Sequence, residues 1–388
     1  MHPEILPTTL PPAQGTRVLV AMSGGVDSSV AAALLKRSGY DVVGVTMKLY
    51  HDGDTTPDRP CCSLDSVNDA RRVCEAIGAP HYVLNMQQPF HRDVVSDFVA
   101  EYSRGRTPIP CVRCNTFTKF RDLVLTADRI EAPLVATGHY ARVIDGELHT
   151  GLDPAKDQSY FLWGLRREVL SRLQLPVGAQ TKAETRAVAR ELGLRMVASK
   201  PESQDICFVP DGDHARVIAE HAGADAPALA RGNVVTTDGR VIGEHDGFAR
   251  FTVGQRKGLP GGSREPLYVV AIRPDSREVV VGRREELDGR EATARELNWL
   301  VHPAPVVGDR VQVRVRHRAP LVSGRITDLT GDAVSVTLDE PQFAIAPGQS
   351  LVLYDGDRVL GGGVIDGNEV GRVAAAATPA RQLPVIAA

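Results

Sequence analysis

Within residues 17–49 the sequence predicts a strand, a glycine-rich turn, a helix and a second strand in immediate succession. Arg17–Met22 is an apolar, β-prone run. Residues 28–36 are rich in Ala and Leu and are followed by Gly39, which suits the left-handed position after a helix. Val42–Leu49 is the second apolar run. Strands joined in this way by a helix run parallel, so the order predicts an α/β domain with a parallel sheet and flanking helices.

The same alternation continues to about residue 208, and the pattern then changes. Further strands are expected at 81–84 and 134–137, and helices at 63–77, 90–103, 115–129 and 181–192, the last with capping-box residues Thr181 and Glu184. Beyond residue 209 short β-prone runs are separated by Gly, Pro and Asp, which predicts two small β-rich domains, the last barrel-like. We therefore expect a disordered lead at 1–15, an α/β domain at 16–208, a central β-rich domain at 209–280, a barrel-like domain at 281–366 and a disordered tail at 367–388.

The composition is that of an ordinary soluble globular protein, with 43% apolar and 24% charged residues. No apolar stretch approaches the ~20 residues needed to cross a bilayer, and the N-terminal residues show no secretory signal. Six cysteines in 388 residues are too few for a disulfide scaffold, so we predict a cytoplasmic protein without a membrane partner. The net charge of −3 means that any nucleic-acid binding depends on local basic patches.

The turn Ser23-Gly24-Gly25-Val26-Asp27-Ser28-Ser29 has features of a phosphate-binding loop. Its glycines allow close approach of the backbone, and the following helix offers N–H groups and a positive dipole end to an anion. Ser23 and Ser28 add hydroxyl donors, whereas Asp27 next to phosphate implies a bridging Mg²⁺. The turn is not a GxxxxGK[ST] loop. The alternative is a glycine-rich turn in which Asp27 caps the helix.

Two cysteine-containing segments are candidates for covalent chemistry. Cys111 and Cys114 form a CxxC after a Pro-rich loop, and Cys207 follows in residues 203–208. Cys114 stands near the predicted start of a helix, where the dipole would stabilise a thiolate.

The residues alone leave three interpretations of the cysteines open. A cysteine can be a small buried apolar side chain, the interpretation we adopt for Cys74. The CxxC could bind a metal together with Cys61, Cys62 or Cys207, although no second CxxC or HxxxH supports this. Alternatively, one thiol could carry persulfide sulfur and a second could release it by forming a disulfide.

Seven short motifs of this chain together resemble those of one protein family. They occur in the order SGGVDSS (23–29), GVTMKLY (44–50), GRTP-x-P-x-x-x-CN (105–115), ATGHYAR (136–142), KDQSYFLW (156–163), SQDICF (203–208) and FTVGQRKGL (251–259). SGGVDSS resembles the PP-loop of N-type ATP pyrophosphatases, which cleave ATP between the α and β phosphates. Together the motifs resemble the bacterial tRNA-specific 2-thiouridylases (the MnmA family) over roughly residues 16–363.

This resemblance implies a reaction and its participants. The expected reaction is ATP-dependent 2-thiolation of the wobble uridine of tRNA, in which the base O2 is adenylated and sulfur is then transferred from an enzyme cysteine persulfide. The expected cofactors are ATP and Mg²⁺. The expected partners are the tRNA anticodon loop and a cysteine desulfurase or sulfur-relay protein that donates the persulfide sulfur.

The resemblance also implies roles for particular residues. Cys114 matches the catalytic nucleophile and Cys207 the cysteine that carries the persulfide. Positions that contact ATP match Ala21, Met22, Ser23, Gly24, Gly25, Val26, Asp27, Ser28, Met47 and Gly138. Positions that contact tRNA match His139, Lys156, Asp157, Gln158 and Gln349. The sequence departs from the family where its target-base loop often reads Asn-Pro-Asp, since the corresponding residues are Ile109, Pro110 and Cys111.

The run 310–318 (RVQVRVRHR) alternates valines with arginines, which predicts a strand with one buried face. Its arginine face is either a solvated surface or a stripe for tRNA phosphates, and Arg256–Lys257 adds local positive charge. We take Arg314, Arg316 and His317 as candidate tRNA contacts.

Two other functions are compatible with part of the sequence. A PP-loop ligase acting on a small molecule explains SGGVDSS but leaves the cysteines and the arginine run without a role. A non-catalytic RNA-binding protein with a retained loop would bind tRNA without forming AMP.

Overall fold

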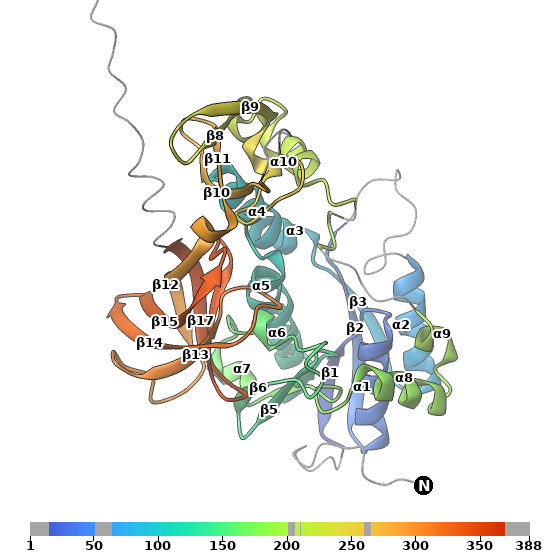
Figure 1. The fold of residues 1–388 in the computed structure, drawn as a ribbon. Helices are drawn as coiled ribbons and strands as arrows, with labels where there is room; N and C mark the ends of the chain where they lie inside the picture. Colours follow the sequence, from blue (N-terminus) through green and yellow to red (C-terminus); the bar gives the residue numbers. More distant parts are fainter. Residues whose placement is uncertain (1–14, 51–63, 201–205, 210, 260–264, 369–388) are drawn as a thin grey trace, which may run out of the picture.

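The computed structural model describes residues 15–50, 64–200, 206–209, 211–259 and 265–368 (Figure 1). Ser63 at the start of the helix expected over 63–77, the adjacent Cys61 and Cys62, and most of the predicted lead and tail lie outside the described residues. Within the described part of the chain, no helix is both long and apolar enough to span a bilayer.

The first domain is built on a parallel sheet with the strand order β3-β2-β1-β4-β7. Its strands are β1 (Arg17–Ala21), β2 (Asp41–Lys48), β3 (His81–Asn85), β4 (Leu134–Ala136) and β7 (Leu173–Gln174). The chain passes from β1 to β2 and β3 on one side and resumes with β4 on the other. The carboxyl ends of β1 and β4 therefore flank the point where the strand order reverses, which is where open α/β sheets bind ligands.

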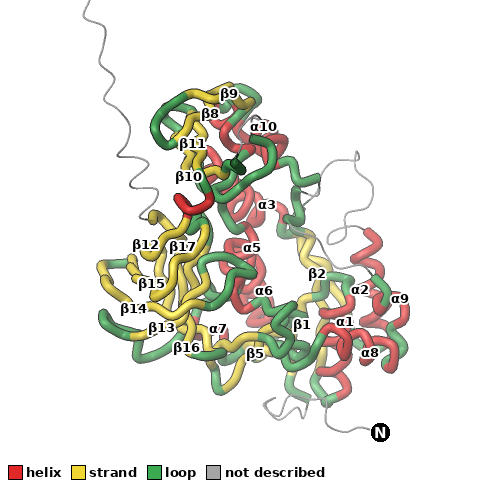
Figure 2. Tube along the Cα trace, viewed as in Figure 1, coloured by secondary structure: helices red, strands yellow, loops and turns green. Residues whose placement is uncertain are grey.

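Helices cover both faces of this sheet, so that β1 and β2 are largely buried on both sides, whereas the edge strand β3 is partly exposed. Val18, Val20 and Val42 belong to one buried cluster, with α1 (Val26–Arg37), α2 (Leu64–Ala76), α8 (Lys182–Glu191) and α9 (Arg195–Ala198). Leu19 and Val43 face the other cluster, with α3 (Gln87–Phe90), α4 (Ser96–Ser103), α5 (Pro110–Arg113) and α6 (Arg121–Arg129) and the π-helical turns η1 (His91–Val95) and η2 (Cys114–Phe120). Figures 1 and 2 show these two helical layers on opposite sides of the strands.

One hairpin of the first domain departs from the predicted α/β pattern. β5 (Ala141–Ile144) and β6 (Glu147–Thr150) pair with each other, and His149 pairs with Arg358 of the C-terminal barrel. After η3 (Ser159–Phe161) and α7 (Arg167–Leu170), the chain returns to the parallel sheet. The first and last domains are therefore joined by strand pairing as well as by side chains.

The two β-rich domains predicted from the sequence are confirmed. The central one has a sheet of order β10-β11-β8-β9, flanked by α10 (His214–Ala222). Its elements are η4 (Pro227–Leu229), β8 (Arg231–Thr236), β9 (Val241–Asp246), η5 (Phe248–Arg250), β10 (Tyr268–Arg273) and β11 (Glu278–Gly282). It lies at the top of Figure 1, above the barrel.

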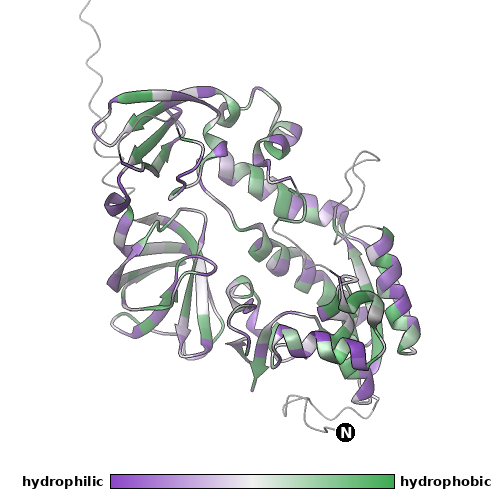
Figure 3. Ribbon diagram, turned by 45° about the vertical axis from the view of Figure 1, so that its right-hand side comes forward, coloured by the Kyte–Doolittle hydropathy of each residue, from purple (hydrophilic) through white to green (hydrophobic). Residues whose placement is uncertain are grey.

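The last domain is an antiparallel barrel of strand order β12-β15-β14-β13-β16-β17, closed by pairing of β12 with β17. After η6 (Arg284–Leu287), its strands are β12 (Asp288–Trp299), β13 (Arg310–Arg314), β14 (Val322–Thr330), β15 (Ala333–Phe343), β16 (Ser350–Asp355) and β17 (Arg358–Asn368). Hydrophobic and hydrophilic residues alternate along several of these strands (Figure 3), as expected when one face lines a core.

The prediction of an arginine stripe on one strand is wrong. Val311, Val313 and Val315 are buried as expected, but the strand ends at Arg314. Arg316 and Arg318 are exposed and lie in the following bend and turn, where Arg318 has a φ of +73°. This left-handed conformation turns the chain away from strand geometry, so the three arginines do not share one face of a strand.

Candidate active site

The loop between β1 and α1 places an uncapped helix terminus at the carboxyl edge of the sheet. Helix α1 starts at Val26, and Gly25 in extended conformation occupies the N-cap position without a side-chain cap. Asp27 is therefore inside the first turn, and the alternative in which it caps the helix is wrong. The free N–H groups of this terminus suit an anion.

Two glycines allow neighbouring backbone to approach this loop. Gly24 has a φ of +70°, and a Cβ there would collide with the backbone of Ser66 on α2. A Cβ on Gly138, after β4, would lie 2.5 Å from the backbone nitrogen of Ser28. The structure thus brings the predicted ATP contact Gly138 against the loop, as expected for a site shared by the ends of β1 and β4.

The loop serines bond within the loop. The Ser23 and Ser28 hydroxyls lie 3.1 Å apart, and the Ser23 N–H donates to Ser28 Oγ at 3.1 Å. Met22 continues the β1–β2 pairing by donating its N–H to Val45, and Met47 lies buried near the end of β2. The predicted ATP contacts on residues 21–28, Met47 and Gly138 therefore gather at one edge of the sheet.

Asp27 is held by side chains that the sequence analysis did not select. Lys182 Nζ lies 2.7 and 2.8 Å from its two carboxylate oxygens, and the Tyr140 hydroxyl donates to it at 2.9 Å. The Tyr140 hydroxyl oxygen also lies 3.0 Å from Thr185 Oγ1, and burial raises the pKa of Tyr140 far above the ordinary value. Lys182 follows a capping residue at the start of α8 and has no motif of its own, so only the fold could reveal it.

A second lysine reaches the same loop from the end of α9. Lys200 Nζ donates to the Gly24 carbonyl at 3.1 Å and forms an ion pair with Asp69 at 2.5 Å. Arg186 fixes this segment by donating to the carbonyls of Ala198 and Lys200 at 2.5 and 3.1 Å. Two lysines distant in sequence therefore supply positive charge to the loop.

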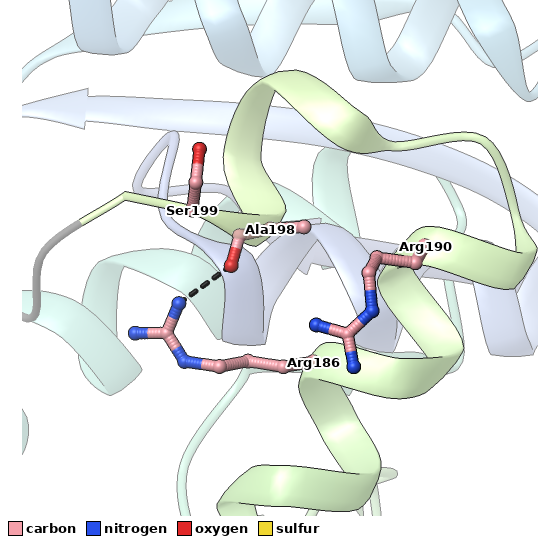
Figure 4. A pocket seen from close by; sticks show the side chains of 4 residues that line it. All are labelled: Arg186, Arg190, Ala198 and Ser199. Atoms are coloured by element: carbon pink, nitrogen blue, oxygen red, sulfur yellow. Dashed lines mark hydrogen bonds between the residues drawn. The ribbon is translucent and has the colours of Figure 1, made fainter.

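A cavity of about 510 Å³ lies beside this segment, lined by Arg186, Arg190, Ala198 and Ser199. Figure 4 shows Arg186 bonded across it to Ala198, with Arg190 alongside on the same helix. Arg186 thus acts as a cap for the end of α9, which orients the neighbouring Lys200.

The position of Cys114 differs from the prediction that it stands at a helix start. The helix begins one turn earlier because Pro110 occupies its first position, where a fixed φ and a missing N–H are tolerated. Cys114 is the first residue of the π-helical turn η2 and is 5% exposed, whereas Cys111 is exposed. The helix-dipole argument therefore does not apply to Cys114.

Cys207 lies beside a group of aromatic side chains, on the same side of the sheet as Cys114. Its neighbour Phe208 packs with Tyr50, Phe90 and Phe98 at ring distances of 6.0, 5.6 and 5.1 Å. Cys207 is partly buried and packs against the apolar cluster that contains Cys114 and Met47. The structure thus places both predicted catalytic cysteines at one cluster.

Cys74 has the structural position that the sequence analysis assigned to it. It is fully buried on α2 in the cluster on the other face of the sheet, and burial raises its pKa to about 11. Among the described residues, no group of three or more His, Cys, Asp or Glu side chains is placed to hold a metal ion.

Two predicted tRNA contacts bond to each other inside the protein. The Asp157 carboxylate accepts bonds from the N–H groups of Gly151 and Ser159 at 3.0 and 3.1 Å, and Arg314 donates to it at 3.1 Å. The side chains of Asp157 and Arg314 are only 5% and 17% exposed. This pair joins the KDQ motif of the first domain to the barrel.

Other predicted tRNA contacts lie around the same junction. Gln158 accepts from the Tyr140 N–H at 2.9 Å, and His317 packs on Phe161 with ring centroids 4.4 Å apart. Lys156 is partly exposed and Arg316 is exposed. Gln349 lies elsewhere on the barrel and donates to the Thr107 carbonyl at 2.9 Å.

His139 follows Gly138 and faces the second helical layer. Its Nδ1 lies 2.7 Å from the Thr137 hydroxyl, and its ring lies 5.8 Å from that of Phe120. Burial, together with nearby Lys119, lowers its pKa to about 3, so the ring is neutral at physiological pH.

A parallel sheet with this loop at its switch point, followed by two β-rich domains, defines a nucleotide-binding protein of the PP-loop class. Three family models match the chain: the tRNA methyl transferase HUP domain over residues 16–211, the tRNA methyl transferase PRC-barrel domain over 217–283 and the aminomethyltransferase beta-barrel domain over 289–365.

Similar proteins identify the family within this class. The chain is 49% identical to a protein of Rhodospirillum centenum, over 91% of this chain and 92% of that one. It is 46% identical to a protein of Koribacter versatilis, over 90% of this chain and 98% of that one. Both are named tRNA-specific 2-thiouridylase MnmA. The chain belongs to this family, the tRNA-specific 2-thiouridylases.

Proposed function

We propose that this chain is a cytoplasmic tRNA-uridine 2-sulfurtransferase that uses ATP to replace O2 of the wobble uridine with sulfur. The observation that carries the proposal is the placement of Cys114 and Cys207 at one apolar cluster with Met47, whose strand neighbours the strand that leads into the phosphate-binding loop. The first domain thus contains both residues suited to phosphate and residues suited to sulfur transfer.

The residues of the loop fit the triphosphate of ATP. Neighbouring backbone packs directly against Gly24 and Gly138, where a Cβ would collide with it. The start of α1 presents unpaired N–H groups, and Lys182 and Lys200 supply positive charge. ATP supplies the leaving group, since attack of the uridine O2 on its α-phosphate releases pyrophosphate and converts O2 into part of AMP. Asp27 would serve as a Mg²⁺ ligand only when Lys182 moves from its carboxylate towards phosphate.

Sulfur transfer then requires both cysteines. The terminal sulfur of a persulfide on Cys207, loaded by a cysteine desulfurase or a sulfur-relay protein, attacks C2 and loses its proton to solvent, and AMP departs with the former O2. The Cys114 thiolate attacks Cys207 Sγ and breaks the S–S bond, so that the transferred sulfur leaves with the bonding electrons as 2-thiouridine. The resulting Cys114–Cys207 disulfide is reduced by an external thiol before the next cycle.

The tRNA substrate reaches this site through its anticodon loop. A uridine stacked within a helix cannot present C2 to an active site, whereas a loop nucleotide can be turned out. Gln158 bonds to Tyr140, which in turn bonds to Asp27 of the nucleotide loop. His139 precedes Tyr140, Lys156 lies in the same motif as Gln158, and Arg316, His317 and Gln349 belong to the barrel. We propose that the RNA lies against both domains.

The proposal is tested by nucleoside mass spectrometry of tRNA incubated with the protein, Mg²⁺, ATP and a persulfide donor. Exchange of one oxygen for sulfur in uridine is expected only with ATP present. Cys114→Ser and Cys207→Ser should each abolish the exchange while tRNA binding stays within a few-fold, and Cys74→Ala is the matched control from the opposite face of the sheet. Full exchange in Cys114→Ser would contradict its role. AMP formation with a small molecule but no thiolated tRNA would favour the ligase alternative.

A further inference from the structure

The segment that carries the CxxC is bound to the C-terminal barrel at its beginning. Thr107 donates its N–H to the Pro347 carbonyl at 2.9 Å and accepts a bond from Gln349 at the same distance. Arg106 forms ion pairs with Glu101 of α4 at 2.7 Å and with Asp366 of β17 at 2.6 Å. This end of the segment therefore lies between the first domain and the barrel.

The other end is held through Arg113, the residue immediately before Cys114. Its guanidinium lies 3.0 Å from Asp97 of α4 and donates to both carboxylate oxygens of Glu296 on β12, at 2.7 and 3.1 Å. The Arg113 side chain is 22% exposed. A two-point bond between a guanidinium and a carboxylate fixes orientation as well as distance.

The barrel backbone is distorted at the residue that makes this contact. Glu296 has a φ of +56°, and the pairing of β12 with β17 shifts register between Arg295 and Asn298. A residue other than glycine occupies this region only when its surroundings hold it there, and irregularities of this kind redirect side chains. The distorted backbone therefore lies at the residue whose carboxylate bonds to Arg113.

We propose that Arg113 is a positioning residue for Cys114, and that the barrel takes part in sulfur transfer by holding the cysteine-bearing helix through Glu296. This inference rests on the proposed role of Cys114 as the nucleophile. Removal of the guanidinium frees α5 and η2 to shift, and a misplacement of about 1 Å at a reacting atom costs roughly 100-fold in rate.

The test compares Arg113→Ala, Arg113→Lys and Glu296→Gln with Arg104→Ala in the full-length protein. Arg104 is the matched control, because its side chain is 69% exposed and, among the described residues, bonds to Glu101 of the preceding helix alone. We expect Arg113→Ala to lower kcat for thiolation by about 10- to 100-fold while KM for ATP and tRNA changes little. Arg113→Lys should recover part of the loss, since an ammonium keeps the charge but not the two-point bond.

A second measurement does not depend on turnover. The rate at which iodoacetamide alkylates Cys114, read by peptide mass spectrometry, should rise about tenfold in Arg113→Ala and less in Glu296→Gln, because buried Cys114 becomes accessible. Unchanged kcat and alkylation in Arg113→Ala, relative to Arg104→Ala, would overturn the inference. If the wild type thiolates no tRNA, the proposed function fails, while the alkylation comparison still decides whether Arg113 positions Cys114.

Discussion

Lys182 Nζ lies 2.7 and 2.8 Å from the two carboxylate oxygens of Asp27, across 155 residues of sequence. Its side chain is 13% exposed and that of Asp27 is 32% exposed. An ammonium held at the start of α1 counters the negative charge that Asp27 places in a phosphate-binding loop.

Lys182→Ala should lower ATP-dependent pyrophosphate release by at least about 100-fold, because the loop loses the cation that offsets the Asp27 charge and keeps that charge beside the phosphates. Release of labelled pyrophosphate in the presence of tRNA measures the effect. Lys36→Ala is the matched control, since this lysine lies in the same helical layer and bonds to the exposed Gly78 carbonyl at 3.0 Å. Wild-type pyrophosphate release in Lys182→Ala would show that Lys182 has no role at the phosphates.

Gly138→Ala tests the contact between the end of β4 and the loop. Its Cβ would lie 2.5 Å from the Ser28 nitrogen and 2.6 Å from the Asp27 carbonyl carbon, so the loop must shift. We expect weakened binding of a non-hydrolysable ATP analogue by calorimetry and a stability loss of about 1–3 kcal/mol. Gly367→Ala is the control, because nothing lies within 4 Å of its Cβ position. Equal nucleotide affinity in the two variants would argue against a site at this contact.

Substitutions in the Asp157–Arg314 pair and at Arg316 should affect stability and tRNA binding separately. Asp157→Asn leaves Arg314 buried without its carboxylate and is expected to lower the free energy of unfolding in urea by about 3–5 kcal/mol.

Arg316→Ala should leave the free energy of unfolding unchanged and weaken tRNA binding. It should also reduce the slope of log affinity against log salt concentration by about 1, because an exposed arginine contacts phosphate without supporting the fold. A salt slope identical to that of the wild type would remove Arg316 from the tRNA interface.

The lowered pKa of His139 predicts that the folded protein loses stability in acid. Burial lowers its pKa in the folded state to about 3, whereas the unfolded side chain takes up a proton near 6.5. The unfolded state therefore binds more protons below pH 6.5, and the folded state loses stability as the pH falls. The contribution at pH 5.5 is about 1.4 kcal/mol. His139→Gln should remove it, so that the difference between the unfolding free energies of wild type and variant changes from pH 7.5 to 5.5. Parallel pH profiles would contradict the assignment.

Local features of the chain were predictable because they depend on neighbours in sequence. Thr181 accepts from the Glu184 N–H while the Glu184 carboxylate accepts from the Thr181 N–H, as their spacing indicates. The strands expected at 81–84 and 134–137 match the observed β3 and β4 to within one residue. The helix start near Cys114 was mispredicted because Pro110 can begin a helix as well as precede one.

Features that depend on distant residues could not be predicted in this way. No pattern around Arg314 distinguishes an arginine directed at RNA from one directed at a buried carboxylate, since both sit on a half-buried strand. The alternation of residues 310–318 correctly identified the buried valines but could not show that the chain turns after Arg314.

By itself the sequence determined the alternation of strands and helices at the start of the chain, the glycine-rich loop between them and the family to which the chain belongs, because periodicity and short motifs are properties of adjacent residues. Tertiary structure alone decided which charges meet: Lys182 with Asp27, Arg314 with Asp157, and Arg113 with Glu296. The physical reason is that an ion pair depends on distances of about 3–4 Å between atoms, and only the folded chain brings residues more than a hundred positions apart within that range.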